Sequence, residues 1–149
     1  MTAIHRNALL PFSSEQLYAL VNDIEAYPQF MDGCVGAEVL QANESRMEAR
    51  LHLARAGISQ SFTTINVLTP YEQIHLTLAE GPFDSFDGVW RFTALAPQAC
   101  KIALDLEFQL RGSLLGAAAA RLFDSVTGNL VAAIVRRATE IYGTEGGTG

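Results

Sequence analysis

The chain of 149 residues is 49% hydrophobic and 17% charged, a composition that predicts a folded domain rather than disorder. Its formal net charge of −6 disfavours binding to nucleic-acid phosphates over a broad surface, so we expect no DNA partner. The N-terminal segment lacks the apolar run of a signal peptide, and the most apolar stretch, Leu114–Ala120, is followed at once by Arg121. We therefore expect a cytoplasmic protein without a transmembrane span, whose contact with membrane surfaces would at most be transient.

The N-terminal part predicts a short strand over residues 3–10 and then a helix that begins near Ser14. Ser13 and Gln16 have the spacing of a capping box, in which two side chains satisfy free backbone N–H groups. Pro28 is expected to end the helix or to start a second short one. Four apolar side chains share one face of the first helix, namely Leu17, Leu20, Val21 and Ile24.

From Val35 onward the apolar residues alternate with polar ones, which is typical of strands with one wet and one covered face. The breaks between strands are short and contain turn residues, as antiparallel hairpins require. The clearest alternations occur in segments 46–54, 72–79, 85–95 and 100–110.

The last element is expected to be a helix that is capped by Ser113, runs to about Tyr142 and stops at Gly143. It would contain roughly 29 residues and be about 43 Å long. Its wide apolar face suits a helix that lies against a curved sheet. We therefore predict an α+β fold in which about seven antiparallel strands wrap around a long C-terminal helix, with two short helices after the first strand. Residues 1–142 would form a single ligand-binding domain, and residues 143–149 a flexible tail.

Two predicted loops carry large apolar side chains where polar ones would suffice. One contains Tyr27, Phe30 and Met31, and the other contains Phe83 and Phe86 beside a Gly-Pro turn. These side chains either surround an apolar cavity or plug the ends of a filled core. On the first interpretation, the residues expected to line the cavity are Tyr27, Phe30, Met31, Phe62, Thr64, Asn66, Phe83, Phe86, Trp90, Phe108, Ala118, Leu122 and Val126.

The direction of the side chains in segment 58–69 is ambiguous from the sequence. If Phe62 points inward, so do Thr64 and Asn66, and a buried asparagine needs a hydrogen-bond partner such as a ligand carbonyl. The alternative places Ile65 and Val67 inside and Asn66 in solvent.

Catalytic chemistry has little support in the sequence. His52 and His75 lie on the polar phase of their strands, and Asp84 and Asp87 are better explained as turn residues than as a carboxylate pair at a cavity mouth. The sequence shows neither metal-ligand spacing nor a phosphate-binding glycine loop. We expect no catalytic residue, no metal and no cofactor other than a bound lipid, and we expect the cysteines to be buried thiols.

Three segments, Leu10–Cys34, Ala56–Thr64 and Gly81–Phe92, are followed by the long helix. In order and spacing they resemble the START-like (helix-grip, SRPBCC) superfamily, and within it the coenzyme Q-binding and polyketide cyclase-like branch that includes the ribosome association toxins. The resemblance covers residues 3–142. It implies a hydrophobic tunnel between sheet and helix, and it implies either polyprenyl quinone ligands or a block on the joining of ribosomal subunits.

The function favoured at this point is non-catalytic binding or transport of a lipophilic molecule, in particular ubiquinone in support of respiration. The first alternative is a toxin that binds the large ribosomal subunit, for which Arg136 and Arg137 are candidate contacts, although the helix dipole and solubility also explain them. The second alternative is a cyclase-like enzyme.

Overall fold

The computed structural model describes residues 2–111 and 116–143. Seven strands form one antiparallel sheet in the order β1-β7-β6-β5-β4-β3-β2. After β1 the chain passes once across the sheet, and the remaining strands follow one another as hairpins. The strands are β1 (Thr2–Leu10), β2 (Cys34–Ala42), β3 (Arg46–Arg55), β4 (Ile58–Thr69), β5 (Gln73–Glu80), β6 (Phe83–Ala96) and β7 (Ala99–Leu110).

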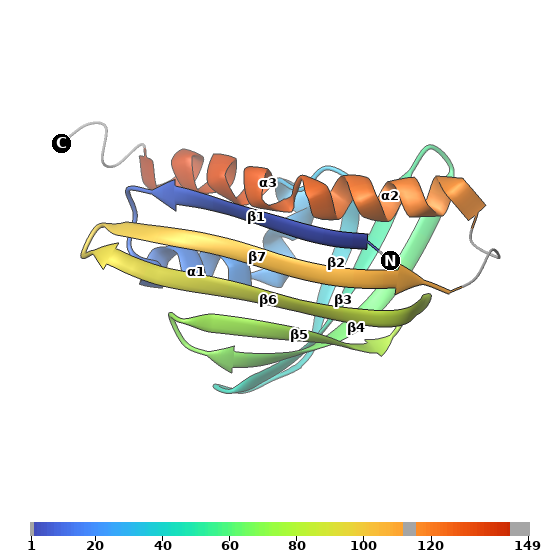
Figure 1. Cartoon of the computed structure of the whole chain (residues 1–149), viewed down its shortest axis with the longest axis horizontal. Coiled ribbons are helices and arrows are strands. Elements are labelled where there is room, and N and C mark those ends of the chain that lie inside the picture. The colour runs from blue at the N-terminus through green and yellow to red at the C-terminus, as the bar shows by residue number, and fades with distance from the viewer. Residues whose placement is uncertain (1, 112–115, 144–149) are drawn as a thin grey trace.

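The sheet is strongly curved, and a long helical segment lies across it. In Figure 1, β1, β7 and β6 run along the molecule, whereas β2, β3 and β4 cross behind them at a steep angle. The helix α2 (Gly116–Gly128) contacts β1 at one edge of the sheet and also β3 and β4, so it spans the curve. The predicted α+β helix-grip architecture is therefore confirmed.

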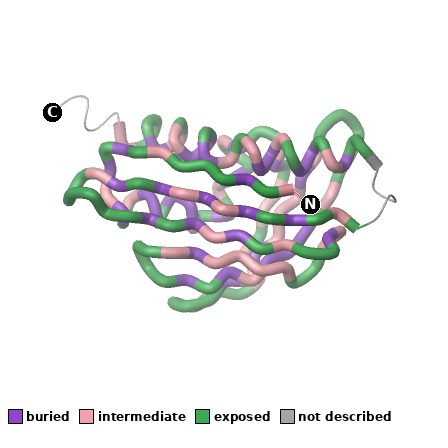
Figure 2. The backbone as a smooth tube through the Cα atoms, in the orientation of Figure 1, coloured by how far each residue is buried: buried purple, intermediate pink, exposed green. Residues whose placement is uncertain are grey.

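The alternating sequence pattern directs one row of side chains on each strand toward the helix. Figure 2 shows buried and exposed positions alternating along the strands. On β7 the inward row is fully buried and consists of Ile102, Leu104, Leu106 and Phe108. On β4, Phe62 and Asn66 are buried whereas Val67 is 49% exposed, so the register that turns Asn66 inward is the correct one. Cys34 and Cys100 are buried free thiols, as expected.

The two short helices cover one end of the sheet. The helix α1 (Ser14–Asn22) begins with the predicted capping box, in which Gln16 N–H donates to Ser13 Oγ at 3.1 Å and Ser13 N–H donates to Gln16 Oε1 at 3.0 Å. The helix ends before Pro28, which instead lies inside the 3-10 helix η1 (Ile24–Gln29). The segment η1 contacts β2, and its buried side chains Ile24 and Tyr27 face the core.

The C-terminal helix is bent, which the sequence pattern did not predict. It consists of α2, of α3 (Leu130–Ala138) and of a final π-turn η3 (Thr139–Gly143), with the break at Asn129. The hydroxyl of Thr127 donates to the carbonyl of Phe123 at 2.6 Å, a contact that tends to bend helices, and Gly128 adds local freedom. The predicted cap at Ser113 and the tail after Gly143 lie outside the described residues.

By length and composition alone, the segment Ala117–Gly143 could cross a membrane, because it has 27 residues and a mean hydropathy of 1.3. However, 44% of its most apolar window is buried inside the protein. The core helix of a soluble protein passes the same test, so this property is weak evidence for a membrane span.

A substitution at Gly33 tests whether the turn after η1 packs against Val126 of α2. Its φ of +90° is unfavourable for other residues, and an added Cβ would lie 2.7 Å from Cγ2 of Val126. We expect Gly33→Ala to lower the free energy of unfolding by about 1–3 kcal/mol more than Gly57→Ala does. Gly57 is the matched control because its φ is +82° and its added Cβ would meet no atom within 4 Å. Equal losses in urea unfolding would contradict the contact with Val126.

Candidate functional site

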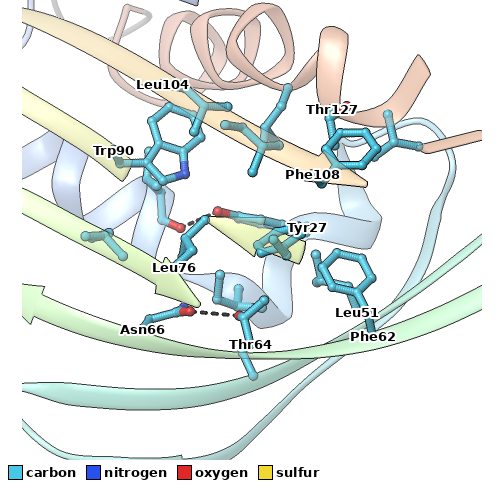
Figure 3. Close-up of a pocket in the computed structure, with 18 of the residues that line it drawn as sticks. Tyr27, Leu51, Phe62, Thr64, Asn66, Leu76, Trp90, Leu104, Phe108 and Thr127 are labelled. Carbon is cyan, nitrogen blue, oxygen red and sulfur yellow. Dashed lines mark hydrogen bonds between the residues drawn. The ribbon is translucent and has the colours of Figure 1, made fainter. Parts of the chain in front are cut away.

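A partly open cavity of about 70 Å³ lies between the inner face of the sheet, the end of α1, the segment η1 and the C-terminal helix. Figure 3 shows its walls, with side chains from β3 to β7 on one side and from η1 and the helix on the other. Ten of the thirteen residues predicted from the sequence line this cavity. They are Tyr27, Met31, Phe62, Thr64, Asn66, Phe83, Phe86, Trp90, Phe108 and Val126.

Three predicted lining residues lie elsewhere. On the helix, the cavity stripe consists of Phe123, Val126, Thr127 and Leu130, which have the i, i+3, i+4, i+7 spacing of one face. Ala118 lies roughly on the opposite side from Phe123 and is exposed, and Leu122 lies about 100° to one side, where it is buried in the core but outside the cavity. Assigning them to the wall was wrong, because the sequence does not show how the helix is rotated.

Phe30 is the third correction. Its ring packs edge-on against the ring of Tyr27, with the two ring centroids 5.7 Å apart, and Phe30 is only half-buried. The 3-10 geometry of η1 turns Tyr27 toward the cavity and leaves Phe30 facing away from it. Tyr27 and Phe86 thus border one cavity, whereas Phe30 does not.

Several lining residues were not among the predicted site residues. Strand alternation could have identified most of them, since Leu51, Leu53, Ile74, Leu76, Leu104 and Leu106 belong to inward rows that the pattern already defined. Asn22 also lines the cavity, and no sequence signal distinguishes it from an ordinary residue near a helix end.

Five phenylalanines fill one end of the interior. Phe83 is at their centre, with ring centroids of the four others 4.9–5.7 Å away in edge-on or tilted arrangements. Such contacts stabilise a core beyond the burial of area alone. The four rings around Phe83 are those of Phe62, Phe86, Phe108 and Phe123. One end of the interior is therefore filled by this phenylalanine cluster, and the cavity lies beside it.

The polar groups of the cavity are few and uncharged. Thr64 donates a hydrogen bond to Oδ1 of Asn66 at 2.8 Å, which is drawn in Figure 3. The hydroxyl of Tyr27 donates to the carbonyl of Val21. Burial, with smaller contributions from Cys34 and Asp23, raises the pKa of this phenol far above its usual range, so it stays protonated at neutral pH. Tyr27 is the one titratable side chain among the described lining residues, which therefore offer no carboxylate or imidazole for acid–base chemistry.

The histidines lie on the outer face of the sheet and are paired with carboxylates there. His5 Nδ1 lies 2.7 Å from Asp105, His52 Nε2 lies 2.9 Å from Glu38, and His75 Nε2 lies 2.8 Å from Asp87. Asp87 and Asp84 do not form a pair at the cavity mouth, because Asp84 lies 3.9 Å from Arg111 instead. Within residues 2–111 and 116–143, no group of three or more His, Cys, Asp or Glu side chains could hold a metal ion.

Two adjacent arginines fasten η1 to the C-terminal helix. Arg136 donates to the carbonyl of Phe30 at 3.0 Å, and Arg137 donates to Oε1 of Gln29 at 3.2 Å. The guanidinium of Arg137 also lies over the Phe30 ring, 5.4 Å from its centroid. Both arginines were candidate ribosome contacts. In the structure they bind η1, the segment that covers one side of the cavity and is called its cover below.

A third arginine joins the turn after η1 to the other half of the helix. Arg55, at the end of β3, donates to Asp32 at 2.7 Å and to Oγ of Ser125 at 2.6 Å. The two helix halves are thus each linked to the segment that closes the cavity.

Comparison with known proteins identifies the family. A family model described as polyketide cyclase / dehydrase and lipid transport matches residues 10–135. The chain belongs to this family. Its fold is that of a START superfamily protein from Mycobacterium smegmatis (TM-score 0.75, 23% identity, covering 93% of this chain and 98% of that one). It is also that of the Zhui aromatase/cyclase from Streptomyces (TM-score 0.75, 18% identity, covering 91% and 89%).

The relatives found by sequence include a bacterial toxin and a mitochondrial binding protein. The chain is 42% identical over 142 residues to the ribosome association toxin RatA of Escherichia coli, covering 95% of this chain and 90% of that protein. It is 26% identical over 141 residues to the mitochondrial coenzyme Q-binding protein COQ10 homolog B of Xenopus laevis, covering 92% of this chain and 58% of that protein.

Substitutions of two alanines test which face of the C-terminal helix is turned toward the core. Ala133 is 5% exposed and does not border the cavity, so Ala133→Leu should overpack the core and cost about 1–3 kcal/mol of stability. Ala118→Leu is the control, because the exposed position should change stability by less than about 0.5 kcal/mol. Chemical unfolding measures both, and a large loss for Ala118→Leu would contradict the assigned rotation.

The contribution of the arginine contacts can be measured separately. We expect Arg137→Ala to lower stability by about 1–2 kcal/mol, because it removes a hydrogen bond and a cation–π contact. Arg121→Ala, at an exposed position of the same helical segment, should have an effect within about 0.5 kcal/mol. If the two variants unfold at the same urea concentration, Arg137 does not fasten η1.

Proposed function

We propose that this protein binds a neutral lipophilic small molecule in the cavity without transforming it. The observation that carries the proposal is an interior cavity whose described lining residues are mostly apolar and include no charged side chain. Ligand sites of this kind combine apolar walls with a few placed polar groups. The family description, which includes lipid transport, supports the same class of function.

We further propose a polyprenyl quinone such as ubiquinone as the ligand. The support comes from the name of the COQ10 relative and from the shape of the site, in which apolar walls suit an isoprenoid tail. The cavity, at about 70 Å³, is smaller than the roughly 300 Å³ of ordinary ligand sites, so the tail requires η1 or the phenylalanine cluster to move. For a protein that binds ubiquinone, the physiological role that we propose is support of respiration.

The experiment is quinone binding to the delipidated full chain, after native mass spectrometry and solvent extraction of what the purified protein carries. Ala49→Leu places extra atoms at a buried cavity-lining position, and Ala133→Leu places the same atoms at a buried position outside the cavity. We expect Ala49→Leu to reduce quinone binding at least about tenfold, whereas Ala133→Leu should retain it once its stability loss is accounted for. Equal binding by the wild type and Ala49→Leu would place the ligand elsewhere.

A second candidate function is association with the large ribosomal subunit in the cytoplasm. The observation in its favour is the 42% identity to RatA, which extends over 95% of this chain. Because Arg136 and Arg137 are engaged with η1, replacing them would disturb the cavity cover as well as any ribosome contact. A cyclase reaction has less support, because the likeness to the aromatase/cyclase, at 18% identity, concerns the fold alone.

Salt separates the two candidates. Apolar burial does not depend on charge, so quinone affinity should change less than about twofold between low and high salt. Ribosome binding through cationic side chains should fall steeply over the same range, because counterions are released. Sedimentation with purified ribosomal subunits and quinone titration, each at low and high salt, measure both. Salt-sensitive quinone binding would contradict the apolar site.

A further inference from the structure

The deepest polar group of the cavity has a hydrogen-bond donor to spare. Asn66 is 1% exposed, and its Oδ1 already accepts the hydroxyl of Thr64. This bond fixes the side-chain amide so that its Nδ2–H donors have no partner among the described residues. Figure 3 shows the pair on the wall formed by β4. Because Asn66 lines the cavity, these donors are available to an acceptor that a ligand brings into it.

A second free donor is the indole N–H of Trp90. The residue is 2% exposed and lines the same cavity, yet its nitrogen has no hydrogen-bond partner among the residues that the structure describes. In Figure 3 this nitrogen points toward the middle of the cavity. Asn66 pairs with Leu76 of β5 and Trp90 pairs with Ile74 of the same strand, so the donors come from opposite sides of β5. Strand spacing and rise put their Cα atoms about 12 Å apart.

The charges that such a site lacks are equally informative. The described lining residues include no Lys, Arg or His side chain that could neutralise an anion. A carboxylate or phosphate drawn into these walls would lose its hydration without gaining a counter-charge. The unpaired groups are these donors and one buried acceptor, Oδ1 of Asn22, which has no hydrogen-bond partner within residues 2–111 and 116–143.

From these observations we infer that the cavity binds its ligand with the head inward, and that the head is a neutral ring bearing two oxygen acceptors on opposite sides. Asn66 Nδ2–H and Trp90 Nε1–H donate to the two oxygens, while the apolar tail lies toward η1 and the helix. Thr64 acts through Asn66 by fixing its orientation. This inference rests on the proposed function and specifies the chemistry of the head, and it excludes fatty acids and phospholipid heads from the inner site.

The test compares ligands that share one tail. Decyl-substituted dimethoxybenzoquinone, decylbenzene and decanoate are titrated against the delipidated full chain in the same detergent. The measured quantity is the ratio of the decylbenzene Kd to the quinone Kd. We expect Asn66→Leu and Trp90→Phe each to lower this ratio about five- to tenfold, because each removes one hydrogen bond to the head. Thr63→Val should leave it unchanged, since Thr63 is a buried neighbour on β4 that does not line the cavity and whose hydroxyl accepts from Arg50.

Each outcome decides between defined alternatives. If both variants retain the wild-type ratio, or if decanoate binds as tightly as the quinone, the inferred head site is wrong while lipophilic binding stands. If neither the quinone nor decylbenzene binds the folded wild type, the proposed function itself fails. Circular dichroism and thermal unfolding confirm that each variant is folded, and because the ratio is taken within one variant, a general loss of stability cancels.

Discussion

The structure depends on burying the apolar inner face of a single curved sheet. On β7 alone, four consecutive inward residues are fully buried, and an uncovered face of that kind would not be stable in water. One helix is too narrow to fill the curve, so the chain also supplies α1 and η1 at one end and a group of phenylalanines at the other. The cavity is the volume that these covering elements leave between them, and its walls are apolar for the same reason that the fold is stable.

The edges of this cover are joined by polar contacts. Arg55 joins the turn after η1 to α2, while Arg136 and Arg137 join η1 itself to α3. The bend at Asn129 lies between these two sets of contacts, so both halves of the helix reach the same short segment. Arg136 and Arg137 thus have a structural role, which weakens the case that these two side chains are free to meet an anionic partner.

Most of the fold and much of the site could be predicted from local patterns. Alternation in 100–110 and the Ser13–Gln16 capping box depend on neighbouring residues, and the sequence shows both directly. Ala118, Leu122 and Phe30 were misplaced because their direction depends on how a helix is rotated against a distant sheet. The ambiguity at Asn66 has the same origin, since the register opposite β3, where Met47 pairs with Asn66, settles which face is inward. The contacts of Arg136 and Arg137 join residues more than 100 positions apart, and no local pattern encodes them.

Whether a long-tailed ligand can enter is a question of relative magnitudes. The polar contacts that join η1 and the following turn to the helix are partly exposed hydrogen bonds and one ion pair, each contributing about 1 kcal/mol or less, and the burial of Ile24 and Tyr27 adds to them. A ligand that buries roughly 300 Å² of apolar surface gains about 7 kcal/mol at 25 cal/mol per Å². This gain is larger than the loss of the arginine contacts alone, and the burial of Ile24 and Tyr27 must be kept or replaced by contacts with the ligand. On the proposed function and the inferred head site, η1 parts from the helix to admit the ligand, and the arginine contacts form again after the ring oxygens have reached Asn66 and Trp90.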